Sequence, residues 1–243
     1  MRNELLSLGI FIISTTLYTV LWGKTIDILV KSKLVTKFAK FIMNYSRMKL
    51  DQIKFYIIWF GYLFMSLFGT ILFSLVYKIN LFNIINVNNF KYIAIFSLIG
   101  FIVQLSASSM ILTVISLIKR DINWYKVISD INWVKFGNKL PKALKPLYPL
   151  SGAFFEEIYF RGCIFLILIT KFNFLGITGA LIIVAMLFII QQVINTQSFY
   201  QAVSMSIGAL CISIVGCILI LATGSFLPAL ICHELYVLFY LRN

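Results

Sequence analysis

Long apolar stretches alternate with short polar or basic connections along this chain. Seven of them are candidates for membrane-spanning helices, at residues 5–29, 55–77, 92–118, 150–169, 175–194, 202–222 and 226–241. An α-helix needs about 20 predominantly apolar residues to cross the hydrocarbon core of a bilayer, and these stretches approach or exceed that length. The first stretch continues past Trp22 without a small-residue cleavage site, so we expect it to remain as a span. The pattern predicts an all-α, polytopic transmembrane helical bundle with about seven spans.

The composition supports the same class. Hydrophobic residues make up 61% of the chain and charged residues 12%, more apolar material than a soluble core of this length can shelter. We therefore expect a single membrane domain over 1–243, divided into N-terminal spans (1–118), a basic interfacial connection (119–149) and a core of later spans (150–243). The four cysteines lie within apolar stretches and show no CxxC spacing, which predicts buried free thiols: Cys163, Cys211, Cys217 and Cys232.

The net charge of +13 comes largely from two clusters of seven basic residues each, at 31–54 and 119–145. Both clusters lie between apolar stretches, which is the positive-inside pattern and also favours contact with anionic lipid headgroups. It argues against a nucleic-acid partner. We therefore expect a multi-pass protein of the cell membrane with the N-terminus outside, the C-terminus cytoplasmic, and the 78–91 connection outside. In the 119–149 connection, Trp and Tyr among lysines suit the headgroup level, and Ser151 is expected to N-cap the next helix.

Candidate chemistry is concentrated in the fourth stretch, where Glu156, Glu157 and Arg161 interrupt an apolar run. The chain has only eight acidic residues, and an ionisable group at membrane depth costs at least ~2.5–3.5 kcal/mol. Glu157 and Arg161 are four residues apart in the orientation that favours a helical ion pair. Glu156 is rotated from Glu157 by about 100° around the helix, so it requires a different partner.

That partner is expected on a later stretch. His233 is the only histidine and is followed by Glu234, while Gln191, Gln192 and Asn195 interrupt the fifth stretch. The alternative for His233 is a satisfied packing residue, and for the amides interhelical hydrogen bonds worth ~0.6–2 kcal/mol each. A zinc site is disfavoured, because a segment that begins like HExxH has valine in place of the second ligand. We expect neither a metal nor a cofactor.

These residues resemble the motifs of the CAAX-processing and bacteriocin-processing (CPBP or Abi) intramembrane proteases over roughly 149–241. The first motif, EExxxR, is matched in full by residues 156–161, with Gly162 following. The second, FxxxH, is matched by Phe188 with Gln192 in place of histidine. In the third, His233 is present, but Val237 replaces the Asn or Asp four residues later; the Thr223–Ala229 segment resembles the lead-in to this motif.

The resemblance implies a glutamate-dependent intramembrane endopeptidase that cuts peptides or lipidated tails. Glu156 would be the base and His233 an oxyanion donor, while Glu157 and Arg161 hold the site together. The substrate would contact Phe188, Asn195 and Val237. Gln192 stands in the second catalytic position but cannot accept a proton, and a valine offers no hydrogen bond, unless Asn195, Gln191 or Glu234 replaces them. The alternative is a catalytically degraded pseudo-protease that binds a peptide or membrane-protein partner as an immunity, scaffold or transport-accessory subunit.

Overall fold

The computed structural model describes residues 2–46, 48–81, 90–142 and 144–241, and within these ranges every regular element is a helix. The elements are α1 (Arg2–Lys31), α2 (Lys33–Met43), α3 (Leu50–Tyr77), α4 (Phe90–Ile118), α5 (Trp124–Ser129), α6 (Asn132–Lys139), α7 (Leu147–Glu157), the π-helix η2 (Ile158–Phe165), α8 (Leu166–Lys171), the 3₁₀ helix η3 (Asn173–Leu175), α9 (Gly176–Val193), α10 (Phe199–Thr223) and α11 (Leu227–Leu241). The all-α prediction is confirmed.

Within the described residues, five helices are long and apolar enough to cross a membrane. They cover Asn3–Lys31, Leu50–Tyr77, Phe90–Ile118, Asn173–Val193 and Phe199–Thr223, and correspond to five of the seven predicted stretches. The other two stretches differ in form. The fourth is divided into α7, η2 and α8, and the seventh contains only a shorter apolar helix, Leu227–Phe239. The predicted free cysteines are confirmed, since all four are buried and unbridged.

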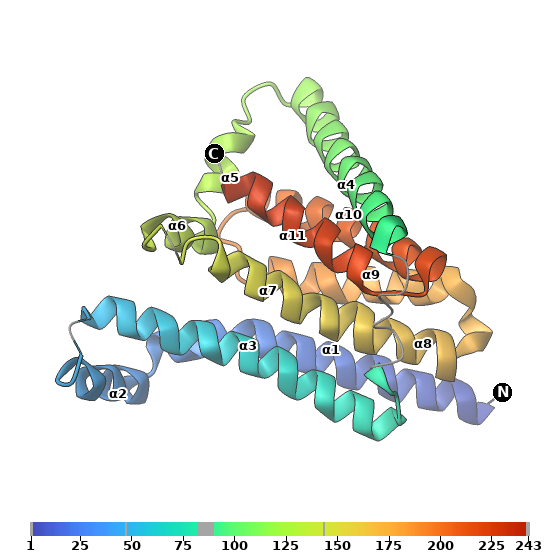
Figure 1. Cartoon of the computed structure of the whole chain (residues 1–243), viewed down its shortest axis with the longest axis horizontal. Helices are drawn as coiled ribbons and strands as arrows, with labels where there is room; N and C mark the ends of the chain where they lie inside the picture. The colour runs from blue at the N-terminus through green and yellow to red at the C-terminus, as the bar shows by residue number, and fades with distance from the viewer. Residues whose placement is uncertain (1, 47, 82–89, 143, 242–243) are drawn as a thin grey trace.

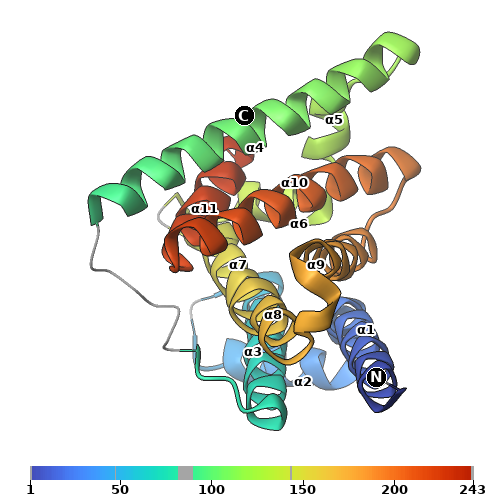
Figure 2. The same cartoon turned by 90° about the vertical axis from the view of Figure 1, so that its right-hand side faces the viewer.

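The helices pack in two groups joined by a central pair of segments (Figure 1). One group consists of α1, α2 and α3, and the other of α4, α10 and α11. Between them, α7 contacts both α3 and α11, while α9 contacts both α1 and α10. Figure 2 shows α4 on the far side of the molecule from α1 and α2. The central segments therefore touch both groups, and they carry the candidate site.

The position of α4 follows from small and polar residues along one face. Ser97, Gly100, Gln104 and Ser108 recur at helical spacing, and Ser97, Gln104 and Ser108 have at most 2% of their surface exposed. A Cβ on Gly100 would lie 2.7 Å from Leu219 of α10 and 3.3 Å from the sulfur of Cys232 in α11. Small residues let membrane helices approach closely. The sequence division grouped this helix with the preceding spans, whereas its packing partners are α10 and α11.

The start of α7 corrects one local prediction. Ser151 is not the N-cap, because the helix begins at Leu147 with Pro146 at its N-cap. Pro149 falls within the first turn, where its missing N–H costs no intrahelical hydrogen bond. The Ser151 hydroxyl instead donates to the Tyr148 carbonyl (2.9 Å) and accepts from Trp59 Nε1 of α3 (3.0 Å). The Ser151 side chain therefore connects α7 to α3 and does not cap the start of α7.

The two basic connections contain short helices. The 31–54 cluster includes α2, whose N-cap Ser32 accepts from the Val35 amide, and the 119–145 cluster includes α5 and α6. Arg47 and most of the 78–91 connection lie outside the described residues.

Candidate functional site

The site is centred on the end of α7, where two carboxylates lie next to each other at the start of a π-helix. Glu157, Arg161 and His233 have 0%, 0% and 2% of their surface exposed, and Glu156 has 7%. The helices around them are α3, α9, α10 and α11, so the site lies between the two packing groups. The π-helical turns of η2 follow directly, and π-helical insertions often occur at functional sites.

Glu157 is held by two charged or polar partners. Its Oε1 lies 3.2 Å from Arg161 Nη1, so the predicted helical ion pair is present. The same oxygen lies 2.8 Å from His233 Nδ1 of α11. A carboxylate only accepts hydrogen bonds, so Nδ1 of this histidine carries a proton. Glu157 therefore binds one partner on its own helix and one on another.

Arg161 has two further contacts, one with α10 and one with α9. Its Nη2 donates to Ser213 Oγ of α10 at 3.1 Å. The guanidinium carbon lies 4.4 Å from the ring centre of Phe188 in α9, a close cation–π contact. A Cβ on Gly216 of α10 would lie 3.5 Å from Arg161 Nε and 3.7 Å from Glu157 Oε2, so the absence of a side chain there leaves the pair uncrowded. These contacts connect η2 to α9 and α10.

Glu156 points to a different set of helices. Its Oε1 accepts from the Tyr62 hydroxyl of α3 and, at 3.1 Å, from Gln192 Nε2 of α9. The Tyr62 hydroxyl accepts in turn from Gln191 Nε2, and Gln192 Nε2 also donates to Gln191 Oε1 at 2.8 Å. The four side chains form a closed network. Glu156 thus has a partner on a later stretch, Gln192, and its partners differ from those of Glu157.

The hydrogen-bond networks of Glu156 and Glu157 face each other across a gap. Glu156 Oε2 and His233 Nε2 are 3.9 Å apart there, which is too long for a direct hydrogen bond. A separation of this size between two polar atoms suits a bridging water. The Glu156 side chain is 10% exposed and the His233 side chain 3%, so the carboxylate is the more accessible of the two.

The other predicted site residues lie around this centre or away from it. Phe188 is fully buried, with its ring 5.9 Å from that of His233, so here it packs against the ion pair. Asn195 Nδ2 donates to the Gly23 carbonyl of α1 at 3.0 Å and forms no hydrogen bond with Glu156. Val237 lies one turn after His233 and is partly buried. Among the described residues, no group of three or more His, Cys, Asp or Glu side chains is arranged to hold a metal ion.

A comparison with protein families places the chain. A family of unknown function, DUF5968, matches residues 90–242, more than half of the 243 residues. The chain belongs to DUF5968. No curated protein and no solved structure matches it. The DUF5968 region begins where α4 begins, and it includes both carboxylates, Arg161, the two glutamines and His233.

Two residues that help to hold Glu156 lie before the DUF5968 region, and neither was expected from the sequence. Tyr62 supplies a hydroxyl to Glu156, and Trp22 of α1 supports it by donating from Nε1 to the Tyr62 carbonyl at 3.0 Å. Their rings are 5.0 Å apart. In the sequence both are aromatic residues inside apolar stretches, where aromatic side chains are common as packing groups. The available signal is that a buried tyrosine or tryptophan needs a partner for its polar atom.

Proposed function

We propose that this DUF5968 protein is a CPBP-like intramembrane endopeptidase that cleaves a peptide or lipidated tail, with Glu156 as the base and His233 as a donor to the reacting carbonyl. The observation that carries the proposal is the 3.9 Å gap between Glu156 Oε2 and His233 Nε2. Two ionisable groups from separate helices face each other there, inside an apolar protein where packing alone does not require them. The EExxxR resemblance supports the same assignment.

The proposed roles require a particular arrangement of protons. As a donor to the reacting carbonyl, His233 would carry a proton on Nε2 directed at the gap, while Glu156 Oε2 accepts. Two carboxylates, Glu156 and Glu157, face one guanidinium, so the imidazole in this state would balance the second carboxylate. Tyr62 and Gln192 hold the other carboxylate oxygen, which keeps Oε2 directed at the gap.

In the proposed reaction, Glu156 Oε2 takes a proton from a water in the gap, and the resulting hydroxide attacks the scissile carbonyl carbon. His233 Nε2–H stabilises the negative charge that develops on the carbonyl oxygen. When the carbon–nitrogen bond breaks, the proton on Glu156 passes to the leaving amine. The products are a carboxylic acid and an amine, and the two side chains return to their starting states. Glu157 and Arg161 keep the imidazole in place.

A second candidate is a pseudo-protease that binds a peptide or membrane-protein partner at this site without cutting it. One observation favours it: the group in the second catalytic position is the amide of Gln192, which donates to Glu156 and cannot take a proton. Loss of a general base typically removes ~10²–10⁴ in rate, and loss of an oxyanion donor at Val237 a further ~10²–10³. Such a protein would act as an immunity, scaffold or transport-accessory subunit.

We further propose a seven-span topology in the cell membrane. The α7–η2–α8 segment would be the fourth span and α11 the seventh, with the two basic connections and the C-terminus in the cytoplasm and the N-terminus outside. The positive-inside rule supports this orientation, because fourteen of the 21 basic residues lie in 31–54 and 119–145.

A cleavage assay separates the two functions. Wild type, Glu156→Gln and the double variant Gln192→His/Val237→Asn would be co-expressed with small tagged membrane peptides, and cleaved peptide measured by immunoblot. Asp51→Asn is the control, because it also neutralises a carboxylate, and Asp51 is exposed in the first turn of α3, outside the site. The endopeptidase proposal expects cleavage by wild type and by Asp51→Asn, and its loss in Glu156→Gln.

The pseudo-protease proposal expects a different result from the same four proteins. Wild type and Glu156→Gln would be equally inactive, and cleavage would appear only in the double variant, which restores a histidine and an amide to the two altered motif positions. A capture experiment then gives a positive readout, since a bound peptide should crosslink to wild type more than to Glu156→Gln. Equal crosslinking and no cleavage in any variant would refute both proposals.

A further inference from the structure

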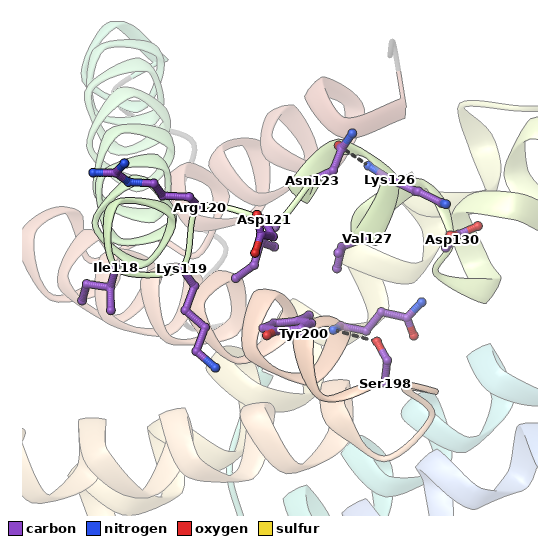
Figure 3. Close-up of a pocket in the computed structure, with 12 residues that line it drawn as sticks. Ile118, Lys119, Arg120, Asp121, Asn123, Lys126, Val127, Asp130, Ser198 and Tyr200 are labelled. Carbon is purple, nitrogen blue, oxygen red and sulfur yellow. Dashed lines mark hydrogen bonds between the residues drawn. The ribbon is translucent and has the colours of Figure 1, made fainter.

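A second candidate site is formed by residues outside the carboxylate cluster. A hollow of about 800 Å³ is formed by the connection 118–123 after α4, by one side of α5, and by the first turn of α10 (Figure 3). Its volume is within the range of about 300–1,000 Å³ that is typical of small-ligand sites. It shares no residue with the site around Glu156, so its role does not depend on the proposed function.

Basic residues outnumber acidic residues in the lining of the hollow. Lys119, Arg120 and Lys126 face two acids, Asp121 and Asp130, and the latter is already paired with Lys135 at 2.9 Å. No hydrogen bond or ion pair among the described residues engages the side chains of the three basic residues. Figure 3 shows Asp121 near the centre of the hollow, above Tyr200. Lys119 extends downward beside Tyr200, Arg120 is directed away to one side, and Lys126 extends to the other side toward Asp130. The excess of positive charge favours an anionic ligand.

The position of the hollow indicates which anion. It lies where α4 ends and α10 begins, and both helices are apolar enough to cross a membrane. Large apolar side chains next to it are open to the surroundings, with Leu117 72%, Ile118 77% and Phe199 76% exposed. Trp124 of α5 packs edge-on against Tyr200 and donates from Nε1 to Ser116 Oγ at 2.6 Å. Amphipathic aromatic residues in this arrangement are typical of the headgroup level of a bilayer.

We propose that the hollow binds the headgroup of an anionic phospholipid from the surrounding leaflet. Lys119 and Lys126, on opposite sides of the hollow, would attract the phosphate, and the acyl chains would follow the exposed apolar side chains at the end of α4 and the start of α10. The Asp121 carboxylate can only accept hydrogen bonds, so it suits a headgroup with hydroxyl donors, such as glycerol, rather than a bare phosphate monoester. The cytoplasmic leaflet, where we place this connection, is the anionic one.

Native mass spectrometry of the full chain in detergent tests the proposal. Phosphatidylglycerol and phosphatidylcholine would be titrated in parallel, and the apparent dissociation constant of the first bound lipid measured. We expect wild type to prefer phosphatidylglycerol and Lys119→Gln/Lys126→Gln to weaken its binding by about 25-fold, from about fivefold for each basic residue removed near the lipid phosphate. The matched control is Lys33→Gln/Lys37→Gln, which removes the same charge from α2 and should leave the first binding constant unchanged.

Two further arms identify the lipid as the source of the phosphate. Phosphatidylglycerol with brominated chains should quench the fluorescence of wild type more than that of Trp124→Phe, since Trp124 lies beside the hollow. Soluble glycerol 3-phosphate should compete poorly, because it lacks the acyl chains. Equal weakening by the α2 control variant would show nonspecific charge attraction and overturn the proposal. Effective competition by glycerol 3-phosphate would instead make the hollow a site for a free phosphate compound, which also overturns it.

Discussion

Replacement of Arg161 tests whether the two carboxylates have separate roles. Arg161→Ala removes the guanidinium that lies 3.2 Å from Glu157, the hydrogen bond to Ser213 and the contact with the Phe188 ring. Removing one partner of a buried ion pair costs ~3–5 kcal/mol, because the other charge remains buried without compensation. A loss of this size lowers the ratio of folded to unfolded protein by roughly a hundredfold or more.

The measurement is the monodisperse fraction of a fluorescent-protein fusion on size-exclusion chromatography after extraction in mild detergent, followed by its thermal midpoint. Arg161→Ala should lose most of the monodisperse peak. Glu156→Gln should keep it, because the new amide oxygen can still accept from Tyr62 and Gln192. Arg161→Ala and Glu156→Gln together therefore separate a role in stability from a role in function within one motif.

A compensating variant checks the physical cause. Arg161→Met combined with Glu157→Gln removes both charges of the pair and keeps an oxygen that can accept from His233. Replacing a buried ion pair by neutral groups is often close to neutral in stability, so the double variant should recover much of the monodisperse peak that Arg161→Ala loses. The reasoning is refuted if Arg161→Ala behaves as wild type while Glu156→Gln aggregates. It is also refuted if the double variant is as unstable as Arg161→Ala.

Three other predictions can be checked separately. Tyr62→Phe removes one donor to Glu156 and keeps the ring, so the free energy of unfolding should fall by only ~1 kcal/mol. Cleavage or peptide crosslinking should fall at least as far as in Gln192→Ala, and unchanged crosslinking would show that the hydroxyl has no role in function. Single cysteines at Lys37 and Ser129, in a background lacking the native thiols, should react with a membrane-impermeant maleimide only after the cells are opened, and labelling of intact cells would overturn the topology. The double variant Gln192→His/Val237→Asn should keep wild-type folded yield, because neither change greatly alters side-chain volume, and a lost chromatographic peak would show that the core cannot accept the new polar atoms.

The sequence was enough to predict most of the fold. Apolar stretches of spanning length have one stable solution in a bilayer, a helix whose backbone hydrogen bonds are internal, so the all-α class follows from the pattern. The fourth stretch is the exception in detail. Its helix continues from α7 through η2 to α8 but is π-helical over Ile158–Phe165. Hydropathy does not record this change, nor the contacts of Arg161 with Ser213 of α10 and of Glu157 with His233 of α11.

The candidate site was predictable only in part. Glu157 and Arg161 are four residues apart on one helix, so local geometry alone predicts their pairing. The Tyr62 contact joins residues 94 positions apart, and nothing in the sequence near this tyrosine distinguishes it from a packing residue. The partner of Asn195 was not predictable for a related reason. A polar residue on a membrane helix can form a hydrogen bond with any neighbouring helix, and here the acceptor is the Gly23 carbonyl of α1.

The arrangement of the two carboxylates has a mechanical consequence. Adjacent residues on a helix point about 100° apart, so Glu156 is bound by Tyr62 of α3 and Glu157 by His233 of α11. Each carboxylate is therefore anchored to a different packing group, and the distance from Glu156 Oε2 to His233 Nε2 depends on how closely the two groups approach. A peptide that enters between the groups would change this distance directly. In the proposed functions, peptide binding and water activation would be coupled through the same gap, and a chain that lost catalysis would keep a site that responds to an occupant.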